Sequence, residues 1–371
     1  MPVRWGQPSR TALRGSLRLL SLLTTAAVPM RNARRGGRLL LLQLAPTVLL
    51  AQQRATLEFS GPAPEAGVFG QQVSESWAGV VSTNFFSAAT HVAAINQTLP
   101  AGYVSTSIPG KPWQYSLWPR DTSGFLREAI YWGDMEIARA NAAAIIGLAA
   151  ADGGGFPEHW DGTTPSDNGT AVDGAANVVI SLVALWQRLP RADPLALKIA
   201  GFLQGESSPV NKWLPAIGAN PGLVPGTGEF GSGCGLAEPV YNVVQNSAVQ
   251  SALRAVALLQ RSLGETTAAD ALDGAALLLR GNMTRLLKNT TDGGWIWPID
   301  TKTLTATPAI TNPTVNIGFA GINWGFTLLS DGPQGEYTPG TQTSWPEGFA
   351  AAKATYARLL STPLRNDLWN K

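Results

Sequence analysis

The stretch that decides the fold class is FLREAIYWGDMEIARANAAAIIGL, residues 125–148. Both halves carry apolar residues at the three- and four-residue spacing of an amphipathic helix. In the second half this spacing is kept by Ile137, Ala140, Ala144, Ile145 and Leu148. Gly133-Asp134 lies between the halves, and a glycine there permits a tight turn. The stretch therefore predicts a helical hairpin.

Apolar residues with the same spacing recur along most of the chain. The further stripes lie within residues 73–95, 178–186, 195–203, 249–259, 272–286, 315–329 and 349–359. Together with the opening hairpin they predict about nine helices, and no segment has the period-two pattern of a strand. Each stripe is also what ordinary core packing requires, so the stripes by themselves indicate a fold class and no function.

The connections between these helices are of two kinds. Gly133-Asp134 and Gly264-Glu265 are tight turns, whereas residues 98–121, 151–173, 205–245 and 289–312 are long loops. This alternation predicts an all-α fold of stacked helical hairpins. Long loops gathered at one rim of such a stack would build a cleft.

The composition excludes several classes of function. Apolar residues make up 44% of the 371 residues, enough for a sizeable core, while charged residues are only 14% against roughly 25% in average domains. The net charge is +2 and no basic stripe indicates nucleic-acid binding. A single cysteine, Cys234, excludes an intrachain disulfide, and two histidines exclude a histidine-rich metal site. Any catalysis should therefore use carboxylates, without a metal or an organic cofactor.

Residues 1–52 have the layout of a leader and residues 53–371 that of the folded domain. Arginines precede an apolar run that ends in small residues near Ala51, as in a secretory signal, and Met30 is an alternative start. Four sequons, at Asn96, Asn168, Asn282 and Asn289, agree with a secreted, extracellular glycoprotein. The alternatives are a membrane anchor or an organelle transit segment, although the apolar run is short for a membrane span.

The richest loop is Trp113-Gln-Tyr-Ser-Leu-Trp-Pro-Arg-Asp121, which leads into a helix. Aromatic rings cover the apolar faces of sugars, and Arg and Asp side chains bind their hydroxyls. Trp118, Arg120 and Asp121 supply both kinds of contact. The alternative is a helix start with Asp121 as its N-cap and Arg120 as the partner of that carboxylate.

Two further loops carry acids. The loop 153–174 offers Glu158, His159, Trp160, Asp161 and Asp173, or it is only a glycine-rich turn with solvated carboxylates. In the loop 231–241, Glu238 is an isolated acid in an apolar, glycine-rich setting. Such a setting favours the raised pKa of a general acid, although an acid near a helix start is also favoured by the helix dipole.

Taken together, the three loops resemble glycoside hydrolase family 15, the glucoamylase-like enzymes, over roughly residues 75–360. The segment Tyr115–Asp121 is similar to the aromatic-x-x-Trp-x-Arg-Asp segment of that family, and Cys234–Glu238 is similar to its acid-bearing loop. The resemblance implies an (α/α)6 toroid of helical hairpins, which would be incomplete at the C-terminus of this chain. It also implies an exo-acting enzyme that releases glucose from non-reducing ends of α-glucans with inversion.

The resemblance also assigns roles to residues. Arg120 and Asp121 would bind hydroxyls of the terminal sugar, and Trp118 and Trp160 would line the sugar pocket, with Glu158 and Asp161 nearby. Glu238 would be the general acid. The chain departs from the family pattern at Ala237 and Pro239, and Glu347 is the best remaining residue for a general base.

Three interpretations therefore compete. The first is the exo-acting α-glucosidase. The second is a degenerate carbohydrate-binding protein that lacks the general base. The third is another helical-toroid hydrolase, of the mannosidase or trehalase kind. All three predict an oligo- or polysaccharide partner, and none predicts nucleic acid, a stable membrane association or a particular oligomeric state.

Overall fold

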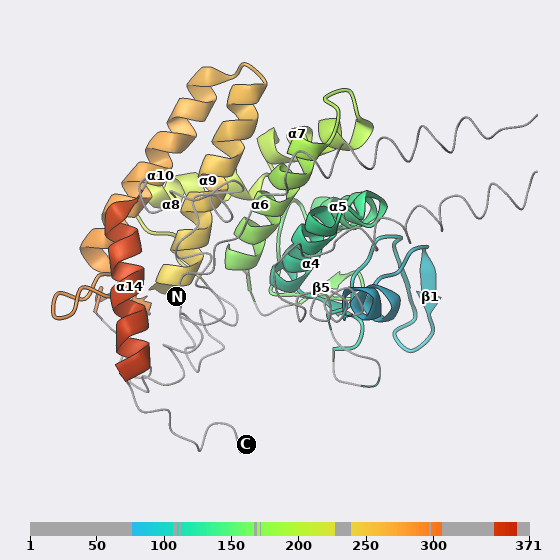
Figure 1. Cartoon of the computed structure of the whole chain (residues 1–371), viewed down its shortest axis with the longest axis horizontal. Helices are drawn as coiled ribbons and strands as arrows, with labels where there is room; N and C mark the ends of the chain where they lie inside the picture. Colours follow the sequence, from blue (N-terminus) through green and yellow to red (C-terminus); the bar gives the residue numbers. More distant parts are fainter. Residues whose placement is uncertain are drawn as a thin grey trace, which may run out of the picture. The chain divides into compact units, whose positions relative to one another are not determined.

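The computed structural model describes residues 76–106, 110, 113–166, 169–170, 172–226, 239–296, 298–305 and 345–361, all within the unit Phe59–Lys371 (Figure 1). The helices are α4 (Pro119–Trp132), α5 (Met135–Ala151), α6 (Val172–Arg188), α7 (Pro194–Gln204), α8 (Pro209–Gly218), α9 (Val243–Ser262), α10 (Thr266–Leu286) and α14 (Pro346–Ser361). The strands are β1 (Thr90–Val92), β2 (Gln97–Leu99), β3 (Ser116–Leu117), β4 (Trp160–Asp161), β5 (Thr164–Pro165), β6 (Val240–Asn242) and β7 (Pro298–Asp300). Helix predominates, as the sequence predicted.

Two predicted helical hairpins are confirmed. Gly133 ends α4 with φ of 76°, and its N–H bonds back to the carbonyls of Ala129 and Ile130. Gly264 takes the same left-handed conformation, with φ of 86°, in the turn between α9 and α10. Glycine is suited to both turns because it has no Cβ to clash at positive φ. The closed toroid itself stays a prediction.

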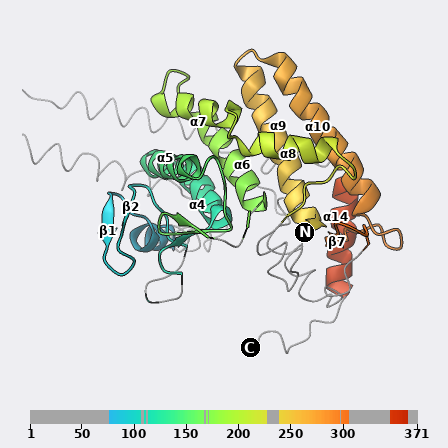
Figure 2. The same ribbon diagram turned by 180° about the vertical axis from the view of Figure 1, so that it is seen from behind.

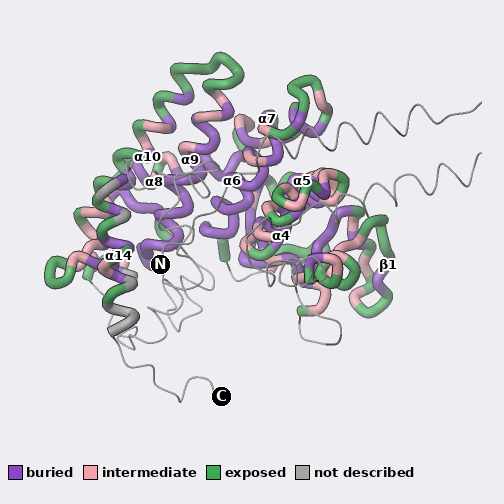
Figure 3. Tube along the Cα trace, in the orientation of Figure 1, coloured by how far each residue is buried: buried purple, intermediate pink, exposed green. Residues whose placement is uncertain are grey.

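Helices α4, α6 and α9 are successive neighbours, and α10 packs on α9 and then on α14, an order that can be followed in Figures 1 and 2. Helix α6 is buried from Val172 to Trp186 with the single exception of Ala184, and α9 is buried without interruption from Val243 to Leu253 (Figure 3). A helix that is buried on all sides must be covered by other elements on every face. These two helices therefore form the centre of the described core.

The predicted stripe over residues 73–95 is helical only in part. A helix covers residues 76–84, and the chain then forms the antiparallel pair β1 and β2, with Thr90 opposite Leu99. Asn96 closes the turn between these strands at φ of 51°. The prediction of helix beyond residue 84 was wrong. Strands β1 and β2 have only three residues each, which is too short for the alternation of apolar and polar residues that identifies a strand in a sequence.

The segment 205–245, predicted as a loop, contains the helix α8. Ser208 caps α8 by accepting a bond from the N–H of Val210, and Val210, Trp213 and Ile217 are buried on one face. Pro209 suits the first helical turn, where its missing N–H costs nothing. The sequence did not predict this helix, because it has only ten residues and contains Pro215, and a proline inside a helix is unfavourable. The stripe predicted at 315–329 lies outside the described residues.

Among the described residues, no helix combines the length and apolarity needed to cross a membrane.

A glycine at one close contact gives a test of this packing. A Cβ on Gly102, which has φ of 86°, would lie 2.0 Å from the carbonyl oxygen of Ala140 in α5. Gly102→Ala should therefore lower the free energy of unfolding by about 2 kcal/mol or more, measured by urea denaturation. Gly147→Ala is the matched control, since it lies in α5 with nothing within 4 Å of its Cβ. It should stabilise slightly, and equal behaviour of the two variants would contradict the close approach.

Candidate functional site

A small sheet joins the loops that precede α4 and α6. Strand β3 pairs antiparallel with β4, with Ser116 opposite Asp161 and Leu117 opposite Trp160, and β4 pairs with β5. The Ser116 hydroxyl also donates to a carboxylate oxygen of Asp161 at 2.6 Å. Two of the predicted long loops therefore meet at the N-terminal ends of α4 and α6, where the sequence placed its first two candidate segments.

A buried ion pair holds these two helix ends together. Nε of Arg120, in the first turn of α4, lies 2.7 Å from Oδ2 of Asp173, in the first turn of α6. The exposed fractions of the two side chains are 11% and 1%, so the pair is largely removed from water. A charge in such a place requires a partner. The carboxylate of Asp173 thereby fixes the position of the guanidinium.

Asp121 has a different position from that of Arg120. The N-cap of α4 is Trp118, without a side-chain cap bond, so Asp121 is not the cap. It lies in the first turn and is exposed. A carboxylate there is favoured by the helix dipole. Its proposed contact with a sugar hydroxyl stays a prediction.

Trp118 forms an aromatic pair with His159. The two rings stack with centroids 4.5 Å apart and planes inclined by 19°. His159 is 4% exposed, and its Nε2 lies 3.4 Å from Oδ2 of Asp161. Its Nδ1 is buried without a hydrogen-bond partner among the described residues. His159 therefore packs on one face of the indole of Trp118. The sequence placed His159 in the loop 153–174 but did not indicate this role.

Glu158 and Trp160 are buried next to this pair. Glu158 is 7% exposed, and Trp160 is 1% exposed with its ring against Phe156 at 5.9 Å in an edge-to-face arrangement. The ring of Trp160 is thus part of the core, so a sugar would reach it only if neighbouring side chains moved. Of the predicted residues here, Trp118 and Asp161 have more accessible surface.

Tyr103 links the loop before β3 to β4. Its hydroxyl donates to the carbonyl oxygen of Tyr115 at 2.6 Å and lies 3.4 Å from that of Trp160. Burial raises the pKa of Tyr103 far above its ordinary value, and the charge of Asp161 adds to the effect. The phenol therefore keeps its proton and its donor role at neutral pH.

Trp113 is an exposed aromatic residue at the start of the same loop. It is 61% exposed, and its φ of 59° is unusual for a bulky side chain. Its carbonyl accepts a bond from the N–H of Ser116, so the turn leads directly into β3. The sequence placed Trp113 in the loop without a role, and only the structure distinguishes it from the buried aromatics.

The two predicted catalytic acids are less well placed. Glu238 lies outside the described residues. Glu347 is exposed in the first turn of α14, which packs on α10, and Figures 1 and 2 show α6 and α9 between α14 and α4. The described residues therefore do not bring Glu347 next to Arg120. Within them, no group of three His, Cys, Asp or Glu side chains is arranged to hold a metal ion.

The ion pair gives a testable expectation. Asp173→Asn should lower the free energy of unfolding by about 3 kcal/mol, because it leaves the guanidinium of Arg120 buried beside a neutral amide. Asp270→Asn removes a partner of Arg261 from an exposed pair and should have little effect on the same urea denaturation curve. Equal effects of the two substitutions would show that the 120–173 pair is not buried as described.

No protein-family model and no curated protein matches this sequence. A comparison with solved structures finds similarity to a bacterial glucoamylase complexed with acarbose, with a TM-score of 0.35 and 17% sequence identity. The match covers 49% of this chain and 24% of that one, so the matched part spans about a quarter of the length of the glucoamylase. At this TM-score the likeness assigns neither a fold nor an activity to the chain.

Proposed function

We propose that the protein is a glycoside hydrolase that binds the non-reducing end of an α-glucan beside α4 and α6. The observation that carries the proposal is the buried pair of Arg120 and Asp173, which fixes a guanidinium at the helix ends where Trp118 and Asp121 also lie. A preoriented guanidinium and an exposed carboxylate can bind neighbouring hydroxyls of one sugar. An indole held by a stacked imidazole offers a flat apolar face to the same sugar.

The proposed chemistry is hydrolysis with inversion. Glu238 donates a proton to the glycosidic oxygen, and a second carboxylate takes a proton from the attacking water on the opposite face of the sugar. Inversion requires roughly 6.5–9.5 Å between the two carboxyl groups to leave room for that water. Glu347 is the proposed second carboxylate.

The second candidate is a carbohydrate-binding protein without hydrolysis. The position of Glu347 favours it, because α14 is separated from α4 by α6 and α9. In that case the sugar contacts at Trp118, Arg120 and Asp121 would persist while the base is missing. Hydrolysis by a mannosidase- or trehalase-like enzyme would use the same helix ends for another sugar or linkage.

Export of the protein after loss of residues 1–52 belongs to the same proposal. Among the sequons, Asn96 is exposed at the turn between β1 and β2, where an oligosaccharide can be attached. The side-chain nitrogen of Asn282, in contrast, donates to the carbonyl oxygen of Gly222 at 3.1 Å. Of these two sequons, Asn96 is therefore the better placed to carry a glycan.

The role of Glu238 is tested by substitution. Glu238→Gln should lower the rate of glucose release from maltooligosaccharides by about 100- to 10,000-fold, because the amide cannot donate the proton that the leaving oxygen needs. Glucose is measured by a coupled enzymatic assay, with circular dichroism to check folding. Glu206→Gln is the matched control, since Glu206 is exposed in the turn between α7 and α8.

Undiminished glucose release by Glu238→Gln would remove this residue from the mechanism. Wild-type protein that binds maltooligosaccharides without releasing glucose would establish the second candidate instead. Protein that releases mannose, or that cleaves trehalose but not maltose, would establish the third.

The stereochemistry of the product gives a separate test. Proton NMR of the first glucose released should show the β-anomer, since water attacks the face opposite the leaving group in a single displacement. The α-anomer would indicate retention and would exclude the proposed pair of general acid and general base.

A further inference from the structure

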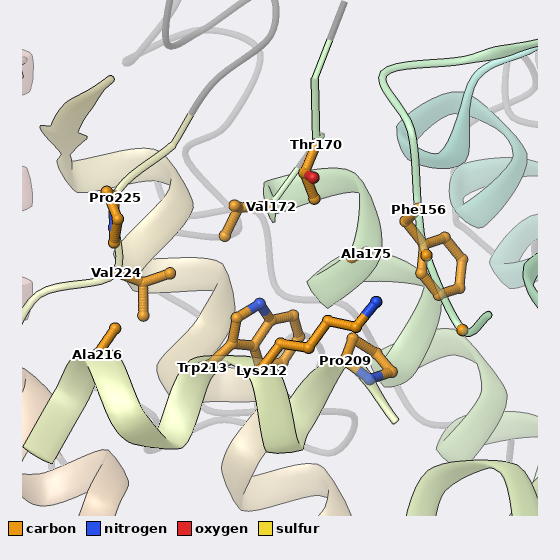
Figure 4. A pocket seen from close by; sticks show the side chains of 12 residues that line it. Phe156, Thr170, Val172, Ala175, Pro209, Lys212, Trp213, Ala216, Val224 and Pro225 are labelled. Carbon is orange, nitrogen blue, oxygen red and sulfur yellow. The ribbon is translucent and has the colours of Figure 1, made fainter. Parts of the chain in front are cut away.

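A cavity of about 270 Å³ lies between α8, the first turn of α6 and the loop of residues 154–156 (Figure 4). Its walls are mostly apolar, and the larger side chains are Phe156, Val172, Trp213 and Val224. Trp213 and Phe156 are both almost fully buried in the protein, so the aromatic walls are fixed by the surrounding core. At about 270 Å³ the cavity is slightly smaller than most ligand pockets, which begin at about 300 Å³.

This cavity is separate from the sugar site proposed above. Val172 and Ala175 of α6 line the cavity. Two other residues of α6 contact α4: Asp173 pairs with Arg120, and Oδ1 of Asn177 accepts a hydrogen bond from Nη1 of Arg127 at 3.5 Å. Successive residues of a helix are rotated by about 100° around its axis. The mean direction of Val172 and Ala175 is therefore about 150° away from that of Asp173 and Asn177. The cavity and the Arg120 site therefore lie against opposite faces of α6.

The polar groups of the cavity include two donors from neighbouring positions of α8. Lys212 is exposed, and its ammonium group extends past Trp213 toward the side of Phe156 and Pro209 (Figure 4). The indole nitrogen of Trp213 lies on the edge of the ring that faces Val172. Neither side chain has a hydrogen-bond or ion-pair partner within the described part of the chain, and no carboxylate is among the described lining residues. The pocket therefore offers donors and a positive charge without a matching negative one.

We propose that this pocket binds a small organic monocarboxylate with an apolar body. The carboxylate accepts a charge-assisted hydrogen bond from Lys212 at the mouth, and the apolar body fills the cavity against its mostly apolar lining. A sugar is the wrong occupant, because its hydroxyl groups would be buried against aliphatic walls without partners. The apolar body must be small enough to fit within the 270 Å³ of the cavity. The proposal is independent of the glycosidase proposal, since it uses the other face of α6.

Hexanoate is the probe, and hexan-1-ol is the matched compound that keeps the apolar body without the charge. Isothermal titration of the full chain should show saturable binding of hexanoate, with at least tenfold weaker binding of hexan-1-ol. Lys212→Met keeps the apolar stem and removes the charge, so it should weaken hexanoate binding at least tenfold and leave hexan-1-ol unchanged. Lys198→Met is the control, because Lys198 is exposed on α7 and does not line the pocket.

A second variant tests the location by filling the space. Ala216→Phe places a ring inside the cavity and should abolish binding of both probes, with folding checked by circular dichroism and by urea denaturation. No saturable binding of hexanoate by the wild type overturns the proposal. So does equal binding of the two probes, an equal loss in Lys198→Met, or full binding by Ala216→Phe. Glucose release is not part of any readout, so failure of the glycosidase proposal has no bearing on these outcomes.

Discussion

Burial of α6 on every side is the constraint on which the rest of the described structure depends. A buried helix can carry polar side chains only if each one has an internal partner. In α6, Asp173 bonds to Arg120, the amide of Asn177 donates to the carbonyl of Asp173, and the hydroxyl of Ser181 donates to the carbonyls of Asn177 and Ser123. Two of these bonds reach α4. The polar groups of α6 therefore fix how α4 lies against it.

This constraint also explains why the candidate sugar site is at the helix ends. In the middle of α4 and α6 the packed side chains leave no room for a ligand, since Leu126, Ala129, Val178 and Val179 are fully buried. At the N-terminal ends the sheet of β3, β4 and β5 joins the two loops, and the first turn of each helix leaves backbone N–H groups without helical partners. Arg120 connects the core to the helix ends. Its charge is paired with Asp173 in the core, and its backbone is in the first turn of α4, next to the loop.

The two faces of α6 differ in chemistry as well as in position. The face toward α4 carries Asp173, which pairs with Arg120, and Asn177, whose amide donates to the carbonyl of Asp173. The face toward α8 presents Val172 and Ala175, and its cavity is completed by the aromatic ring of Trp213 and the ammonium group of Lys212. One helix thereby separates a polar site from an apolar one, and each can be altered by substitution without changing the side chains that line the other.

The sequence by itself determined the helices, their tight turns and the residue types at the helix ends, because those depend on interactions between residues three or four positions apart. It also placed Trp118, Arg120 and Asp121 on the loop before α4. Only the tertiary structure decided that Arg120 pairs with Asp173, 53 positions away, that His159 stacks on Trp118, and that Trp160 is in the core. The reason is physical: periodicity reports which face of a helix is buried, whereas the partner that covers that face is chosen by the packing of distant segments.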